Sequence, residues 1–406
     1  MNNPLPRYLL TALQERLAVM PAVVVTGARQ TGKSTLVRDL LDDNRAWLTL
    51  DDMDVLQAIE SDPSLVFDGM RPVAIDEIQR APELLPGIKH AIDMNRAPGR
   101  FVLTGSANLL LMGGVSETLA GRAVYLTLSP MTRGEQSGAG RCGLWGRLFE
   151  TPPERWIASI ESAAFSNDNW RQLARRGGFP TPAVELETDK ERAIWFDGYT
   201  RTYLERDLQF VSNISSIPDF RRLMRAVCLR TGQILNQTEL GRDVAIPQPT
   251  VHRWLNVLEL SHLLVRLPAW SVNRTKRLIK SPKVYWGDTG LGMHLAGVTE
   301  PTGAHLENVI LLDILTWASA EPVHTNVFYW RTTAGEEIDF LIETAAGVMP
   351  IEIKSGAKVK LSDTKHLRSF RQEHTGVALP GLLLHDGDRT EWLTDDVLAV
   401  PWWRML

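Results

Sequence analysis

The first 130 residues alternate short apolar runs with segments of helical periodicity. The apolar runs predict five strands, at 22–26, 46–50, 73–75, 101–104 and 124–128. Helical patterns cover 8–19, the segment that begins at residue 33, and 82–95. Strands that are apolar on both faces and separated by helices are typical of a parallel sheet covered on both sides. We therefore expect an α/β domain here, followed by a helical lid or connector to residue 199.

The pattern after residue 200 predicts three helices, at 219–231, 237–243 and 249–260. A tight turn at 246–248 joins the last two, which is helix–turn–helix spacing, and Pro249 suits the first turn of the last helix. The stretch 261–287 then contains six basic residues and no acidic one: Arg266, Arg274, Lys276, Arg277, Lys280 and Lys283. This indicates a winged helix with a basic wing that contacts DNA or RNA through Arg274, Lys276, Arg277 and Lys280. A lid or a protein contact is the alternative.

Beyond residue 300 a strict alternation of polar and apolar residues predicts two strands. Asp339 lies on one face of its strand, and Glu352 and Lys354 share a face of the next. The loop at 344–347 lets the strands pair as a hairpin, so that these three side chains converge. Glu307 belongs to a predicted helix at 304–318, on a face expected to be buried. Carboxylates that hold Mg²⁺ beside a lysine favour phosphodiester cleavage, whereas an ordinary hairpin with exposed acids is the alternative.

Composition narrows the class of protein. A length of 406 residues predicts two or three domains, and 44% hydrophobic with 23% charged residues is ordinary for a globular chain. The net charge of −4 means that nucleic-acid binding requires a local basic patch. Cys142 and Cys228 form no paired motif, and we see no signal peptide and no membrane-length apolar run. We expect a soluble cytoplasmic protein with no membrane contact.

The segment from Gly27 to Ser34 matches the phosphate-binding pattern GxxxxGK[ST], between a predicted strand and a predicted helix. Its glycines let backbone N–H groups surround phosphates, and the helix presents its positive amino end to them. Lys33 is expected to reach the β- and γ-phosphates, and the hydroxyl of Ser34 to ligate Mg²⁺. The predicted ATP-binding residues are Gly27, Ala28, Arg29, Gln30, Thr31, Gly32, Lys33, Ser34 and Thr35.

Two further strand ends carry candidate catalytic groups. Asp76 and Glu77 follow a buried strand, which predicts that Asp76 binds Mg²⁺ and that Glu77 is the general base. Ser106 ends another strand and is expected either to sense the γ-phosphate or to cap the strand. Arg122 is a candidate arginine finger or second sensor. A finger supplied from a neighbouring chain would require a homo-oligomer.

Many short motifs in order give the chain a resemblance to a known family over almost its whole length. They are the glycine-rich loop at 27–35, Ile-Asp-Glu at 75–77, Leu-Thr-Gly-Ser at 103–106, Ala-Gly-Arg at 120–122, Tyr-Leu-Glu-Arg-Asp at 203–207, Thr-Gly-Gln at 231–233, Ser-Pro-Lys at 281–283, Gly-Asp-Thr-Gly at 287–290, Leu-Glu-Asn at 306–308, Tyr-Trp-Arg at 329–331, Glu-Ile-Asp-Phe at 337–340 and Ile-Glu-Ile-Lys at 351–354. The chain resembles bacterial and archaeal AAA-type ATPases whose carboxy-terminal domain, formerly of unknown function, is related to PD-(D/E)xK nucleases.

The resemblance implies an α/β multidomain protein with three parts. These are a P-loop ATPase with its lid at 1–199, a winged helix at 200–288 and a restriction-endonuclease-like domain at 289–406. The nuclease pattern of that fold corresponds to Glu307, Asp339, Glu352 and Lys354. One hypothesis is an ATP-driven protein that binds and processes nucleic acid. Another is a nucleotide-switched regulatory or signalling ATPase whose last domain only binds DNA or protein, and a third is an ATPase that guards or inhibits a partner.

Overall fold

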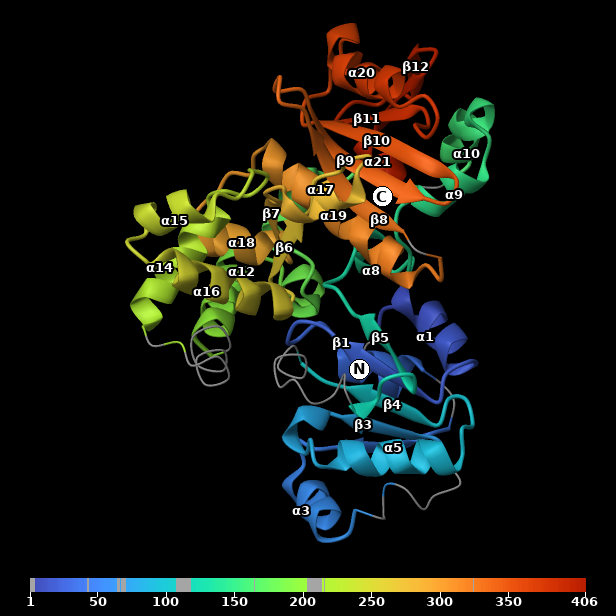
Figure 1. The fold of residues 1–406 in the computed structure, drawn as a ribbon, viewed down its shortest axis with the longest axis vertical. Helices are drawn as coiled ribbons and strands as arrows, with labels where there is room; N and C mark the ends of the chain where they lie inside the picture. The colour runs from blue at the N-terminus through green and yellow to red at the C-terminus, as the bar shows by residue number, and fades with distance from the viewer. Residues whose placement is uncertain are drawn as a thin grey trace.

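Figure 1 shows a parallel sheet at the amino-terminal end, a helical middle part and a second sheet formed by the carboxy-terminal residues. This computed structural model describes residues 4–41, 44–63, 66, 71–106, 118–163, 165–202, 214, 216–323 and 325–406. The motif at 203–207 lies outside the described residues. Within those residues, no helix has the length and apolar character needed to cross a membrane.

The first sheet contains the five predicted strands, and all neighbouring strands in it run parallel. In spatial order they are β2 (Ala46–Thr49), β3 (Val73–Asp76), β4 (Phe101–Thr104), β1 (Ala22–Thr26) and β5 (Ala123–Thr127). The strand between β1 and β3 is therefore β4, and β2 lies at the edge. The predicted α/β core of a P-loop ATPase is confirmed by this parallel sheet and its helices.

Alternate residues of β1 face the two layers of helices. Val24 packs with residues of α5 (Leu84–Met94) and with Ile59 of α3 (Met53–Ser61) on one face. Val23 and Val25 pack on the other face, against α1 (Leu9–Leu17) and against η1 (Leu36–Leu40), which continues the short helix α2 (Lys33–Thr35). This double cover explains why the strands are apolar on both sides.

The middle part contains the three predicted helices, observed as α14 (Ile217–Cys228), α15 (Gln237–Asp243) and α16 (Gln248–Leu260). They are followed by the antiparallel pair β6 (Leu264–Leu267) and β7 (Lys283–Trp286). Between these strands, inside the stretch predicted to form the basic wing, lies a helix, α17 (Arg274–Ile279). Its cause is local, because the side chain of Asn273 accepts hydrogen bonds from the N–H groups of Thr275 and Lys276 and so caps the helix.

The carboxy-terminal sheet is mixed. Its spatial order is β12 (Glu391–Thr394), β13 (Val397–Pro401), β11 (Gly381–His385), β10 (Gly347–Lys354), β9 (Glu337–Thr344) and β8 (Asn326–Arg331). The predicted hairpin is present as antiparallel β9 and β10, whereas β10 and β11 run parallel. The long helix α19 (Gly303–Ala320) and the shorter helix α20 (Lys365–Glu373) pack on this sheet.

The helices between residues 145 and 176 pack with the carboxy-terminal part of the chain. The helices α9 (Trp145–Glu150), α10 (Trp156–Glu161) and α11 (Trp170–Arg176) were expected to extend the ATPase domain. Their tryptophans instead belong to the same apolar core as α19 and the carboxy-terminal strands. The buried pair of Asp313 in α19 with Trp145, whose indole N–H lies 2.6 Å from Oδ1, fixes this packing.

Candidate functional site

The loop after β1 contains three residues with positive φ. Gly27 has φ 147°, and a Cβ there would collide with the carbonyl oxygen of Leu128. Gly32, at φ 90°, immediately precedes the helix α2. Gln30 also adopts a positive φ, 62°, which is uncommon for a residue with a side chain. The loop therefore needs its glycines for steric reasons, as the motif predicted.

Lys33 is buried and directed at its own loop. Its Nζ donates to the carbonyl oxygen of Ala28 at 2.8 Å and to that of Gly27 at 3.3 Å. Burial lowers its pKa to about 8, although the charges of Glu77 and Asp76 act in the opposite direction. A phosphate group arriving at this ammonium would raise the pKa again, so the lysine is suited to an anionic ligand.

Asp76 lies at the centre of a group of hydroxyls at the carboxyl edge of the sheet. Ser34 donates to its two carboxylate oxygens at 2.9 and 3.1 Å, and Thr49 approaches Oδ2 at 3.3 Å. The hydroxyl of Thr104 also donates to Oδ1. These are oxygen ligands of the kind that Mg²⁺ prefers, and they stand beside Lys33. The chemistry of this donor set fits a magnesium ion held together with phosphates, with Ser34 and Asp76 as the protein ligands.

Glu77 follows at a strained position, with φ 57°. Burial raises the pKa of its carboxyl, while Lys33 lowers it. The amide of Gln79 donates to Glu77 and also reaches Oγ of Ser106 at 3.3 Å, and Ser106 is buried. The structure thus brings Glu77 and the predicted sensor Ser106 together through Gln79, a residue that no sequence motif indicated.

Arg122 does not lie with these groups. It precedes β5, and its carbonyl accepts the N–H of Ala22, the first residue of β1. The phosphate-binding loop is at the other end of β1, about 15 Å away at roughly 3.3 Å per strand residue. The guanidinium makes two contacts with Asp93 of α5, at 2.6 and 2.8 Å. The structure therefore places the predicted arginine finger at the opposite edge of the sheet, away from the P-loop of the same chain.

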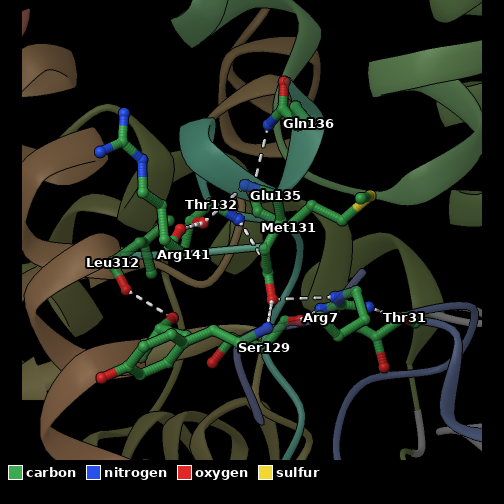
Figure 2. A network of polar contacts seen from close by, with 11 residues as sticks. Arg7, Thr31, Ser129, Met131, Thr132, Glu135, Gln136, Arg141 and Leu312 are labelled. Atoms are coloured by element: carbon green, nitrogen blue, oxygen red, sulfur yellow. Dashed lines mark hydrogen bonds and ion pairs between the residues drawn. The ribbon is translucent and has the colours of Figure 1, made fainter. Parts of the chain in front are cut away.

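Arg7 connects the P-loop to Ser129 and Glu135 (Figure 2). Arg7 donates to the carbonyl oxygen of Thr31 at 2.7 Å, to that of Ser129 at 2.6 Å and to the carboxylate of Glu135 at 3.1 Å. Glu135 is fully buried and also accepts the N–H of Tyr8. Arg7 and Glu135 are 128 residues apart, so no local pattern could have indicated this pair.

The P-loop also contacts the middle part of the chain. Ala28 belongs to the same apolar core as Phe179 and Leu263, and the hydroxyl of Tyr199 reaches the carbonyl oxygen of Arg29 at 3.3 Å. His262 adopts φ 57°, and burial together with the charge of Lys33 lowers its pKa to about 4. The nucleotide loop is therefore packed against the elements that lead to the helix–turn–helix segment.

The carboxy-terminal candidates do converge on the hairpin. Lys354 Nζ lies 2.7 Å from Oε1 of Glu352, and the neighbouring Asp339 accepts the N–H of Ile353 at 2.9 Å. Glu307 accepts the hydroxyl of Tyr285 at 3.0 Å. Burial, followed by the charge of Asp339, raises the pKa values of Glu307 and Glu352.

A buried lysine stands among these acids, and its role was missed by the sequence analysis. Lys283 is only 2% exposed, and its Nζ lies 2.5 Å from Glu337 and 3.5 Å from Asp339. Within the described residues, no group of three or more His, Cys, Asp or Glu side chains is arranged to hold a metal ion. The metal role of Glu307, Asp339 and Glu352 stays a prediction. The sequence signal for Lys283 was its place in the Ser-Pro-Lys motif at 281–283.

The predicted basic wing is only partly available to a ligand. The guanidinium of Arg277 lies 5.3 Å from the ring centroid of Trp270 and 4.8 Å from that of Phe328, and its Nη1 is 2.5 Å from Glu343. This part-buried pair takes Arg277 away from the predicted nucleic-acid contact. Three other predicted residues are exposed, namely Arg274, Lys276 and Lys280.

Two further motif residues, Asp288 and Asn308, have structural roles. Asp288 is buried, caps helix α18 (Thr289–Ala296) and accepts the N–H groups of Gly178 and Phe179. Asn308 of α19 makes two hydrogen bonds with the backbone of Trp286 in β7, at 2.8 and 3.0 Å. Both motifs tie the middle part to its neighbours.

Three family models match consecutive parts of the chain. Residues 20–136 match an AAA domain, 167–302 a domain of unknown function (DUF8612), and 302–405 a domain of unknown function (DUF4143). With the loop and the sheet described above, the first match identifies a P-loop ATPase-type domain. A DUF4143 domain follows at the carboxy-terminal end.

Two curated mycobacterial proteins are similar over nearly the whole chain. They are the uncharacterized proteins Rv2008c of Mycobacterium tuberculosis and Mb2031c of Mycobacterium bovis, each 30% identical over 400 residues. Each match covers 96% of this chain and 82% of the relative.

Solved structures show weaker likeness. The Walker-type ATPase PABY2304 of Pyrococcus abyssi is 18% identical, with 71% of this chain and 94% of that chain covered and a TM-score of 0.45. A signal transduction ATPase with numerous domains, PH0952 of Pyrococcus horikoshii, is 10% identical, with 79% and 48% covered and a TM-score of 0.21. Both TM-scores are below 0.5, so neither likeness supports a conclusion about this chain.

Proposed function

The chain belongs to the family of the mycobacterial proteins Rv2008c and Mb2031c. We propose that it binds ATP with Mg²⁺ and hydrolyses it at its P-loop, which lies in the part that matches an AAA domain. The observation that carries the proposal is the hydrogen bond from Ser34 to Asp76, beside the buried ammonium of Lys33. In a P-loop site these three groups are the ones that hold the metal and the β- and γ-phosphates.

Each residue of the site has a role in this proposal. The backbone of the 27–35 loop binds the phosphates, and Lys33 exchanges its contacts with Gly27 and Ala28 for phosphate oxygens. Magnesium, when bound, supplies positive charge that offsets the charge of the phosphates. Glu77 accepts a proton from the attacking water, which suits a carboxyl whose pKa is raised by burial. Ser106, held by Gln79, orients that water.

We further propose that nucleotide binding acts as a switch on the rest of the chain. Ala28 packs in the core of the middle part, and the hydroxyl of Tyr199 contacts the backbone of Arg29. A change in the conformation of the P-loop would therefore alter contacts with the middle part directly. This supports the regulatory hypothesis, with the middle part as a winged helix that responds to the nucleotide. A cytoplasmic location is consistent with two buried free cysteines, Cys142 and Cys228.

Nucleotide binding and phosphate release test the main proposal. Wild type is compared with Lys33→Ala, Asp76→Asn and, as a matched control, Lys358→Ala at an exposed lysine. Loss of one charge-assisted contact is worth about 1.5–3 kcal/mol, so Lys33→Ala is expected to weaken ATP binding by at least about tenfold. The control should behave as wild type. Equal ATP affinity and equal turnover in all four proteins would contradict the proposal.

A second candidate function is binding and metal-dependent cleavage of nucleic acid. Two observations favour it. One is Oε2 of Glu352, which is buried and has no hydrogen-bond partner within the described residues, beside Lys354. The other is a cavity of about 500 Å³ lined by basic and aromatic side chains, among them Lys280, Arg331, Trp270, Tyr329 and Trp330. Cations beside aromatic rings suit the phosphates and bases of a single strand.

Binding and cleavage are measured separately. Fluorescent single-stranded and duplex DNA and RNA are titrated with wild type and with Lys280→Ala, and cleavage is followed with Mg²⁺ or Mn²⁺, with and without ATP. Cleavage that is lost in Lys354→Ala supports a nuclease, and its response to Lys33→Ala shows whether ATP controls it. Absence of cleavage by the wild type on every substrate, with ATP still hydrolysed, would remove this candidate.

A further inference from the structure

Strand β7 brings a positive charge into the carboxylate cluster of the carboxy-terminal sheet. Lys283 and Tyr285 are two residues apart on this strand, so their side chains point to the same face. That face meets acids from two other elements. Lys283 contacts Glu337 and Asp339 of β9, and Tyr285 donates to Glu307 of α19.

The side chain of Lys283 is almost fully removed from solvent. The side chain is 2% exposed, and its Nζ lies 5.7 Å from the centroid of the Tyr329 ring. A buried ammonium is stable only when its charge is compensated, and the nearest carboxylates, at 2.5 and 3.5 Å, provide that compensation. Conversely, those carboxylates already have their counter-charge from the protein.

Further hydrogen bonds connect strand β7 and the residues just before it to the carboxy-terminal domain. Asn308 of α19 binds both the N–H and the carbonyl oxygen of Trp286, and the hydroxyl of Tyr329 donates to the carbonyl oxygen of Ser281 at 2.5 Å. The strand that carries the lysine is thus also fixed by contacts that do not involve its charge. This distinguishes it from a long side chain that happens to fold over an acidic surface.

We infer that Lys283 is the built-in counter-cation of the carboxylate cluster formed by Glu307, Glu337, Asp339 and Glu352. Its ammonium occupies the position where a divalent metal ion would bind, and its ion pairs fix the middle part to the carboxy-terminal sheet. A divalent cation reaches Asp339 only when this ammonium is withdrawn or removed. The inference bears on the second candidate function, but its tests measure metal binding and stability and require no cleavage.

Metal binding is measured on the full-length, nucleotide-free protein by titration with Mn²⁺, with the free ion followed by electron paramagnetic resonance. Lys283→Met removes the charge and keeps much of the volume. It is expected to bind one Mn²⁺ at least tenfold more tightly than wild type, and adding Asp339→Asn should abolish that site. Lys365→Met, at an exposed lysine, should match wild type. Equal Mn²⁺ affinity in wild type and Lys283→Met would overturn the inference, as would a wild-type site that Asp339→Asn removes.

A stability measurement keeps the inference testable if Lys283→Met folds poorly. Thermal unfolding is compared for wild type, Lys283→Met, Glu337→Gln and the double variant. Lys283→Met leaves Glu337 with only the more distant Arg331, at 3.4 Å, and Glu337→Gln leaves Lys283 with only Asp339, at 3.5 Å. Because each single change weakens the charge compensation of the other group, the double variant should have a higher melting temperature than Lys283→Met alone. If the losses in melting temperature were additive in the double variant, the two charges would not depend on each other. The inference that Lys283 fixes the middle part to the sheet through Glu337 would then be wrong.

Discussion

Arg7 offers the sharpest prediction from the structure, because one side chain connects the P-loop to a buried acid. Replacing it by methionine keeps most of the aliphatic volume and removes the guanidinium. The carbonyl oxygens of Thr31 and Ser129 then lose their donor, and the carboxylate of Glu135 loses its counter-charge (Figure 2). We expect both the stability of the fold and the affinity for ATP to fall.

The magnitude follows from the burial of Glu135. Removing one partner of a buried ion pair costs about 3–5 kcal/mol, because the remaining charge is left without compensation. Glu135 retains the N–H groups of Tyr8 at 2.7 Å and Thr132 at 2.8 Å, so the lower end, about 3 kcal/mol, is expected. Loss of the hydrogen bond to Thr31 destabilises the observed conformation of the loop by about 1 kcal/mol, which corresponds to roughly fivefold weaker ATP binding.

Urea unfolding and nucleotide titration of the same protein measure both effects. Arg38→Met is the matched control, because Arg38 pairs with Asp39 at 2.7 Å on the surface, where its side chain is 55% exposed, and such a pair contributes at most about 1 kcal/mol. The double variant Arg7→Met with Glu135→Gln should recover at least about half of the lost stability. If Arg7→Met loses no more than Arg38→Met, the reasoning about the buried pair is refuted.

Three further predictions concern turnover and pH. Glu77→Gln should keep ATP affinity within about threefold and lower phosphate release by at least about 100-fold, whereas unchanged turnover would exclude Glu77 as the general base. Arg122→Ala should leave turnover within about twofold, because the guanidinium lies with Asp93 at the far edge of the sheet, and a large loss would instead point to a neighbouring chain. Burial raises the pKa of Asp313 to about 7, so the folded chain keeps a proton that the unfolded chain releases near pH 4. Stability should therefore fall as pH rises from about 4 to 7, by up to roughly 4 kcal/mol, and the slope of unfolding free energy against pH should flatten in Asp313→Asn.

The P-loop could be recognised in the sequence because its pattern is local. A phosphate cradle needs glycines, a lysine and a hydroxyl within one turn between a strand and a helix, and all of these stand in the 27–35 loop. Likewise, the polar–apolar alternation around Asp339 and Glu352 predicted a hairpin, since side chains of a strand alternate between its faces. The five parallel strands followed from apolar runs that are buried on both sides.

Only the tertiary structure decided which distant groups meet. The pairing of Arg7 with Glu135, the position of Lys283 among the acids of β9, and the packing of Trp145 against Asp313 join residues more than 50 positions apart. Such contacts leave no periodicity, because they depend on how whole elements pack. The sequence placed Lys283 in a basic stretch predicted to form a wing, and only the fold showed that it is buried. Likewise, only the direction of β5 showed that Arg122 lies at the opposite end of the strands from the P-loop of the same chain.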